Sequence, residues 1–142
     1  MLNIIENLRN NFDSDEFRIG GGVNDDAIGA AERELGLAFP MSYKEFLKEV
    51  GWLEISNVYF FGIPEQLYGE GSVVKMTKFS RENWQLPPNC IVIYSSEDKL
   101  LWCIECDGNV NPVIKGYDTE KRKILSKIAN DFESLMDEYL DQ

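Results

Sequence analysis

The stretch IGAAERELGLAFPMSYKEFLKEVGW, residues 28–52, decides the fold. Apolar residues recur at helical spacing as far as Leu35, and Gly36 follows at once, where a glycine in the left-handed conformation can end a helix. Pro40 has the fixed φ that suits the first turn of a new helix. The apolar stripes are Ala27, Ile28, Ala31 and Leu35 in the first helix and Tyr43, Phe46, Leu47 and Val50 in the second, which Gly51 stops. This stretch therefore predicts two short helices that share a sharp corner.

Patterns on either side of the corner predict one α+β domain over residues 1–142. An amphipathic helix is expected at residues 2–12. A loop follows over residues 13–26, in which Gly20–Gly22 form a flexible connector. Asn24 is expected to be the N-cap of the next helix. Ser72 is expected to cap a further helix that ends near Trp84. Strands are expected at residues 53–63, 90–94, 100–105 and 112–117. The turns between them are too short for parallel crossovers, which predicts a meandering antiparallel β-sheet flanked by helices.

The end of the chain has the clearest helical period. Apolar residues between 124 and 140 follow the 3.6-residue repeat and predict a long amphipathic C-terminal helix. They are Ile124, Leu125, Ile128, Phe132, Leu135, Met136, Tyr139 and Leu140. The opposite face is acidic, which indicates a solvated surface or, as a second interpretation, a partner surface.

Charge and cysteine content limit the function classes. The chain has 14 basic and 25 acidic residues among 142, a net charge of −11. This charge repels nucleic acid and anionic membranes and speeds association with basic proteins, although acidic proteins also gain solubility from it. Three cysteines do not form a disulfide framework, and neither a signal-peptide pattern nor a membrane-length apolar run is present. The sequence therefore predicts a cytoplasmic protein that binds neither nucleic acid nor membrane directly.

Motifs for catalysis or metal binding are weak. The absence of histidine removes Ser-His-Asp and Cys-His catalysis and imidazole zinc sites. Cys103 and Cys106 have redox spacing, but a strand would point their side chains to opposite faces, which favours a structural role. A partial calcium-loop pattern comprises Asp107, Asn109, Asn111 and Asp118. Pro112 stands where that loop requires glycine, so we expect neither a metal nor a cofactor.

The corner residues resemble the SUKH superfamily, which includes the Smi/Knr-type cell-wall regulators of yeast and bacterial immunity proteins. The family pattern is filled here by Ile28, Glu32, Leu35, Gly36, Phe39, Pro40, Tyr43, Phe46 and Leu47. Val50 departs from the residue that usually precedes the last glycine. The resemblance implies an α+β fold and a non-enzymatic role, in bacteria that of an immunity protein bound to a toxin domain, often a nuclease.

Charge and resemblance together predict an acidic immunity protein that covers the basic cleft of a toxin domain, such as a nuclease. The candidate contacts lie in expected loops or at element ends: Trp52, Glu54, Glu65, Tyr68, Glu70, Glu97 and Asp98. A first alternative is a binding or scaffold protein in cell-wall or signalling control. A second is a small hydrolase with two convergent carboxylates, for which Glu97 and Asp98 are the example pair.

Overall fold

The predicted helical corner is confirmed. The helix α2 (Asp25–Leu35) begins behind Asn24, whose side chain accepts a first-turn backbone hydrogen bond of 3.0 Å. It ends at Gly36, which adopts the left-handed conformation with a φ of 72°. The helix α3 (Met41–Val50) then begins directly after Pro40. Each of these boundaries therefore follows from a local residue preference.

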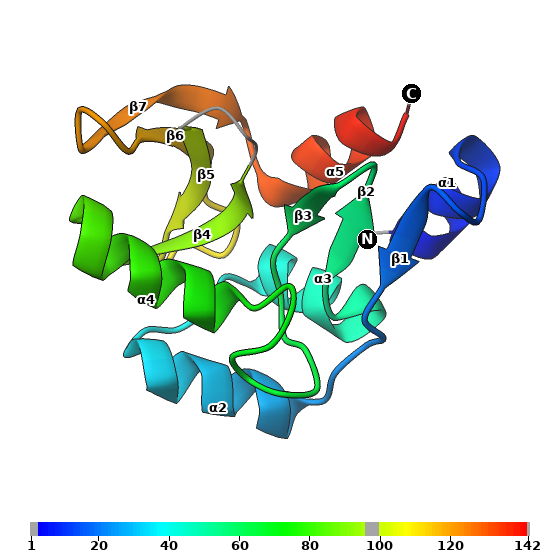
Figure 1. Cartoon of the computed structure of the whole chain (residues 1–142), viewed down its shortest axis with the longest axis horizontal. Helices are drawn as coiled ribbons and strands as arrows, with labels where there is room; N and C mark the ends of the chain where they lie inside the picture. The colour runs from blue at the N-terminus through cyan, green and yellow to red at the C-terminus, as the bar shows by residue number, and fades with distance from the viewer. Residues whose placement is uncertain (1–2, 96–99, 142) are drawn as a thin grey trace.

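The structure, a computed structural model, describes residues 3–95 and 100–141. Within these residues the chain forms a seven-stranded antiparallel sheet whose strands follow one another in sequence order, the predicted meander (Figure 1). The strands are β1 (Phe17–Ile19), β2 (Leu53–Ile55), β3 (Val58–Phe60), β4 (Cys90–Ser95), β5 (Leu100–Glu105), β6 (Ile114–Asp118) and β7 (Lys123–Ala129). The remaining helices are α1 (Ile4–Asn11), α4 (Val73–Trp84) and α5 (Phe132–Leu140).

Both faces of the sheet carry apolar residues, as the alternation along β4 shows. Ile91 and Ile93 belong to a large core shared with α1, α2, α3 and α5. Cys90 and Val92 belong to a smaller cluster that includes Trp84 at the end of α4. The helix α4 lies along β4 (Figure 1), and its buried Thr77 hydroxyl accepts a 3.0 Å hydrogen bond from the Val92 N–H. The meander therefore separates two apolar layers.

The prediction of a long C-terminal helix is wrong in its first half. Residues Lys123–Ala129 form strand β7, which pairs with β6, and only Phe132–Leu140 form a helix. The side chain of Asp118 accepts hydrogen bonds from two backbone N–H groups in the turn that joins β6 to β7. Asp131 caps α5 by accepting a 2.7 Å hydrogen bond from the Ser134 N–H. The spacing of Ile124, Leu125 and Ile128 fits a helix and a strand equally well. Pairing with β6 decides that this segment is a strand.

The single strand expected at residues 53–63 is a hairpin. Strands β2 and β3 are joined by Ser56 and Asn57, which have φ values of 48° and 71°. Positive φ at both central residues is the geometry of a two-residue turn whose twist suits a hairpin. The expected loop at residues 13–26 also contains the short edge strand β1, which pairs with β2.

The segment Gly20–Gly22 differs from the flexible connector that the sequence predicts. The Gly21 N–H donates to the Val50 carbonyl at 2.8 Å, and the Val23 N–H donates to the Leu47 carbonyl at 3.1 Å. The Val50 carbonyl, at the C-terminus of α3, has no helical donor of its own, while the Leu47 carbonyl also accepts from the Gly51 N–H at 3.1 Å. A Cβ on Gly22 would lie 2.0 Å from the Lys48 carbonyl oxygen. The glycines are therefore needed for close backbone packing.

Stability should fall as the pH rises above about 10, because Tyr43 is buried as a neutral phenol. Burial raises its pKa well above the ordinary value of about 10. The unfolded chain releases this proton first, so each further pH unit costs up to about 1.4 kcal/mol for this group until its folded pKa is reached.

Urea unfolding at pH 7, 9, 10 and 11 checks this expectation. The Tyr43→Phe variant loses the hydrogen bond that the hydroxyl donates to the Phe61 carbonyl at 2.6 Å, which lowers stability at pH 7 by about 1–2 kcal/mol. Its stability should nevertheless fall less steeply above pH 10. Equal slopes for variant and parent would show that Tyr43 does not contribute to the alkaline loss.

Candidate functional site

Three of the predicted contact residues meet around an arginine that the sequence analysis did not identify. Arg18 on β1 pairs with Glu54 and Glu70, with Nε–Oε1 and Nη2–Oε2 distances of 2.6 Å each. Its guanidinium carbon lies 5.4 Å from the centre of the Trp52 ring. The Tyr59 hydroxyl donates a hydrogen bond to Glu70. We call Arg18, Trp52, Glu54, Tyr59 and Glu70 the Arg18 cluster.

The ion pair of Arg18 with Glu70 is exposed, which limits its contribution to stability. The side chains of Arg18 and Glu70 are 54% and 49% exposed, and exposed ion pairs contribute about 0–1 kcal/mol. The hydrogen bond from Arg18 lowers the pKa of Glu70. Burial, followed by the hydrogen bond to Glu70, raises the pKa of Tyr59 to about 12. At neutral pH the Glu70 carboxylate is therefore charged, and its partner can be exchanged at little cost.

The other predicted contacts lie in different places. Glu65 lines an open hollow of about 370 Å³ together with Trp52 and Glu70. Tyr68 points instead toward the helices: its hydroxyl donates to Glu34 at 2.5 Å and accepts from Lys78 at 2.6 Å. Glu97 and Asp98 lie outside the described residues. Among the predicted contacts in the described parts, Trp52, Glu54, Glu65 and Glu70 thus share one face.

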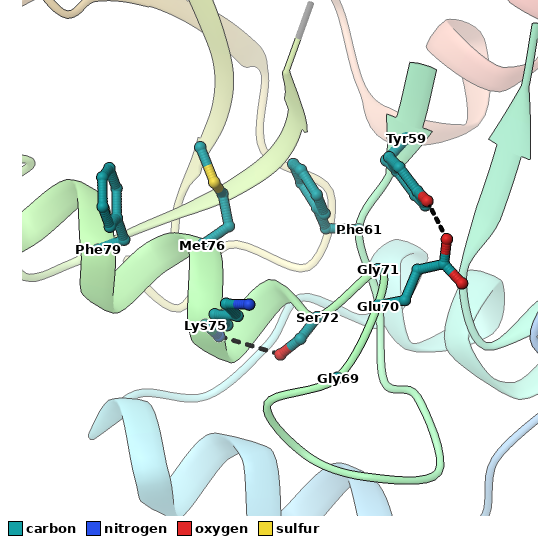
Figure 2. Close-up of a pocket in the computed structure, with 9 residues that line it drawn as sticks. All are labelled: Tyr59, Phe61, Gly69, Glu70, Gly71, Ser72, Lys75, Met76 and Phe79. Atoms are coloured by element: carbon teal, nitrogen blue, oxygen red, sulfur yellow. Dashed lines mark hydrogen bonds between the residues drawn. The ribbon is translucent and has the colours of Figure 1, made fainter. Parts of the chain in front are cut away.

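An apolar groove adjoins the Arg18 cluster and was not predicted as a site. It is an open cavity of about 350 Å³ between the end of β3 and the first turns of α4. Figure 2 shows Phe61, Met76 and Phe79 in a row, with Tyr59 and Glu70 at one end. The remaining lining residues are Gly69, Gly71, Ser72 and Lys75. Met76 and Phe79 stand at helical spacing in the sequence, but their contact with residues that follow β3 depends on tertiary packing.

Glycines bring together the backbone segments beneath this face, a feature we call the glycine crossing (Gly20–Gly22, Gly51, Gly62 and Gly71). The Gly62 N–H donates to the Gly71 carbonyl at 2.8 Å, and the Ile63 N–H donates to the Gly51 carbonyl at 2.9 Å. A Cβ on Gly71 would lie 2.8 Å from the Trp52 ring. The indole therefore packs directly on the backbone of the loop that bears Glu70.

Hydrogen bonds stabilise the charged form of three of the described carboxylates. Glu34, Glu70 and Asp118 have lowered pKa values, caused first by hydrogen bonds from Lys78, Arg18 and the Lys121 backbone respectively. A general acid needs the opposite shift.

The partial calcium pattern is used in local turns, where Asp107 and Asn109 accept backbone hydrogen bonds. Over residues 3–95 and 100–141, no group of three or more His, Cys, Asp or Glu side chains could hold a metal ion.

The thiols should be unreactive in the folded protein. Cys103 is buried in the cluster on the α4 side, while Cys106 packs against the large core, as the strand interpretation predicts. Burial raises the pKa of Cys90 to about 11 and that of Cys106 to about 12, and places the pKa of Cys103 well above its ordinary value. At pH 8 these thiols are therefore protonated, and the thiolate is the reactive form.

Titration with Ellman's reagent at pH 8 checks this expectation. In native buffer we expect the labelling to be slower than in guanidinium by at least about a hundredfold, because each pKa unit above ambient pH lowers the thiolate fraction about tenfold. The denatured sample is the control and should label all three thiols. One thiol that reacts at once in native buffer would contradict the assignment.

Comparison with known proteins gives one family. The sequence model of the family described as SMI1-KNR4 cell-wall, SUKH_5, matches residues 1–141. A search of curated proteins returned no match. No helix among the described residues is long and apolar enough to cross a membrane. The family match covers both the helical corner and the face that bears the Arg18 cluster.

Proposed function

Because the chain belongs to the SMI1-KNR4 family of the SUKH superfamily, we propose that it is an immunity protein of the bacterial cytoplasm. In this role it binds a basic toxin domain, such as a nuclease, and covers its active cleft without performing chemistry itself. Family membership supports the class of function. The choice of a basic partner is supported by the charge and surface of this chain.

The observation that carries the proposal is the meeting of Trp52, Glu54 and Glu70 on one exposed face beside an apolar groove. Interfaces with high affinity combine central aromatic anchors with a polar rim. Trp52 is partly exposed and lines one hollow together with Glu65 and Glu70. We propose these residues as the contact region.

Electrostatics favours a basic toxin. An enzyme that cleaves nucleic acid must bind phosphate and therefore has a positive cleft. A partner with a net charge of −11 is steered to such a cleft, with association rate constants that can reach about 10⁸ M⁻¹s⁻¹ at low salt.

Co-expression tests the proposed function. The probe is the toxin domain encoded by the reading frame adjacent to this chain's own, expressed with and without this protein. We expect cells to survive only when this protein is present. Equal killing in both cultures would contradict the proposal. An adjacent reading frame that encodes no toxin would favour the alternative, a binding role in cell-wall or signalling control.

A charge-matched pair of variants tests the contact region. Replacing Glu54, Glu65 and Glu70 by glutamine should slow association with the toxin domain by about tenfold at low salt, since local charge steers the encounter. The control replaces three exposed acids on other elements, Glu45, Glu82 and Glu138, by glutamine. Both variants have the same net charge, so equal rates measured by stopped flow would exclude the proposed region.

A further inference from the structure

We infer that the groove between β3 and α4 binds one short segment of the partner, an aromatic side chain with an arginine or lysine next to it. This inference rests on the proposed function and states the chemistry of its anchor point. The groove holds about 350 Å³, near the lower end of ligand pockets. It therefore fits one or two side chains of a protruding segment and not a folded surface.

The floor of the groove favours an aromatic side chain. Phe61, Met76 and Phe79 line it in a row (Figure 2), and Phe79 is 48% exposed. Met side chains adapt to the shape of a guest and make favourable contacts with aromatic rings. Burying a ring against this row removes apolar surface from water on both partners.

The charges at the groove decide which of its ends receives the base. Glu70 lines the end of the groove near Tyr59. Its carboxylate is half-exposed, and among the described residues it bonds to the half-exposed Arg18 and to the Tyr59 hydroxyl. An incoming base can therefore pair with Glu70 or with the nearby Glu65. Lys75 lines the groove beside Met76 (Figure 2), where it repels a base and can lie over an aromatic ring. The base thus lies toward Glu70 and the ring toward Phe79.

Other occupants fit this surface less well. A second copy of the chain would bring another charge of −11 against the first, and nucleic acid is repelled for the same reason. Ile19, which is 36% exposed, lines the adjoining hollow together with Trp52 and Glu70. These features leave a basic protein segment as the occupant.

Titrations followed by ¹H–¹⁵N correlation spectra test the inference with three blocked dipeptides. These are acetyl-Trp-Arg-amide, acetyl-Trp-Glu-amide and acetyl-Ala-Arg-amide. We expect the first to shift signals of residues 59–61 and 69–79 in the millimolar range and to bind about fivefold more tightly than either of the others, as about 1 kcal/mol per lost contact implies. Equal affinity for all three peptides, or shifts elsewhere, would overturn the inference.

Two variants with exposed apolar side chains complete the test. Phe79→Ala should weaken acetyl-Trp-Arg-amide at least about fivefold, while Met41→Ala, which removes a 55% exposed side chain from the start of α3, should leave its affinity unchanged. Equal affinity of Phe79→Ala and parent would overturn the inference. If the parent neutralises the toxin but no peptide shifts the groove, the inference fails and the proposed function stands. If the peptides bind while co-expressed cells still die, the proposed function fails instead.

Discussion

Replacing Gly62 by alanine should lower the free energy of unfolding by at least about 3 kcal/mol, because the glycine crossing has no room for a side chain. The added Cβ would lie 1.6 Å from the Gly51 carbonyl oxygen. That oxygen already accepts the hydrogen bond from the Ile63 N–H, and Gly62 itself is bonded on both sides, to Gly71 and Val73. The clash cannot be relieved without breaking the contact between the end of α3 and the loop that follows β3. Urea unfolding, or loss of soluble protein on expression, measures the effect.

Gly29→Ala is the matched control. Gly29 lies inside α2, and its nearest obstacle is the end of the flexible Arg33 side chain, at 3.3 Å. Alanine favours helix more than glycine does, so this variant should gain about 0.5–1 kcal/mol. Similar stabilities for the two variants would show that the glycine crossing is not packed as described.

Phe132→Ala should lower the free energy of unfolding by about 3–5 kcal/mol. Phe132 begins α5 and packs edge-on against two rings of α3, with ring-centre distances of 5.4 Å to Tyr43 and 5.2 Å to Phe46. It is 1% exposed, so its loss leaves a cavity between two helices and the sheet. Thermal or urea unfolding followed by circular dichroism measures the change.

The same substitution at Phe79 is the control for burial. Phe79 is 48% exposed and contacts Trp84 edge-on at 5.1 Å. We expect Phe79→Ala to cost less than about 1 kcal/mol, which also keeps this variant folded for the groove titrations. A loss at Phe79 as large as that at Phe132 would contradict the assignment of the core.

The helical corner could be predicted because its signals are local. A glycine with φ of 72° at residue 36 and Pro40 directly before α3 act within one turn of the chain. Strand β7 could not be predicted in this way, because Ile124, Leu125 and Ile128 satisfy a helical spacing and their true environment is set by pairing with β6. The glycine crossing was missed for the same reason, since its contacts join segments far apart in sequence.

The candidate site could be predicted only in part. Their place in loops or at element ends of a chain with a net charge of −11 predicts Trp52, Glu54, Glu65 and Glu70 as contacts, and in the structure they lie on one face. Arg18 could not be selected, because only the pairing of β1 with β2 brings it between the two carboxylates. Tyr68 is a predicted contact as well, but its hydroxyl contacts Glu34 and Lys78. Composition therefore identifies the character of the surface, while tertiary pairing decides its members.

Inhibition of the purified toxin domain tests the central claim most directly. The toxin encoded by the adjacent reading frame is titrated with this protein, and its remaining activity is measured at low salt. If this protein works by covering the active cleft, activity should fall linearly and vanish at one equivalent. Full toxin activity in the presence of a large excess of this protein would contradict the claim.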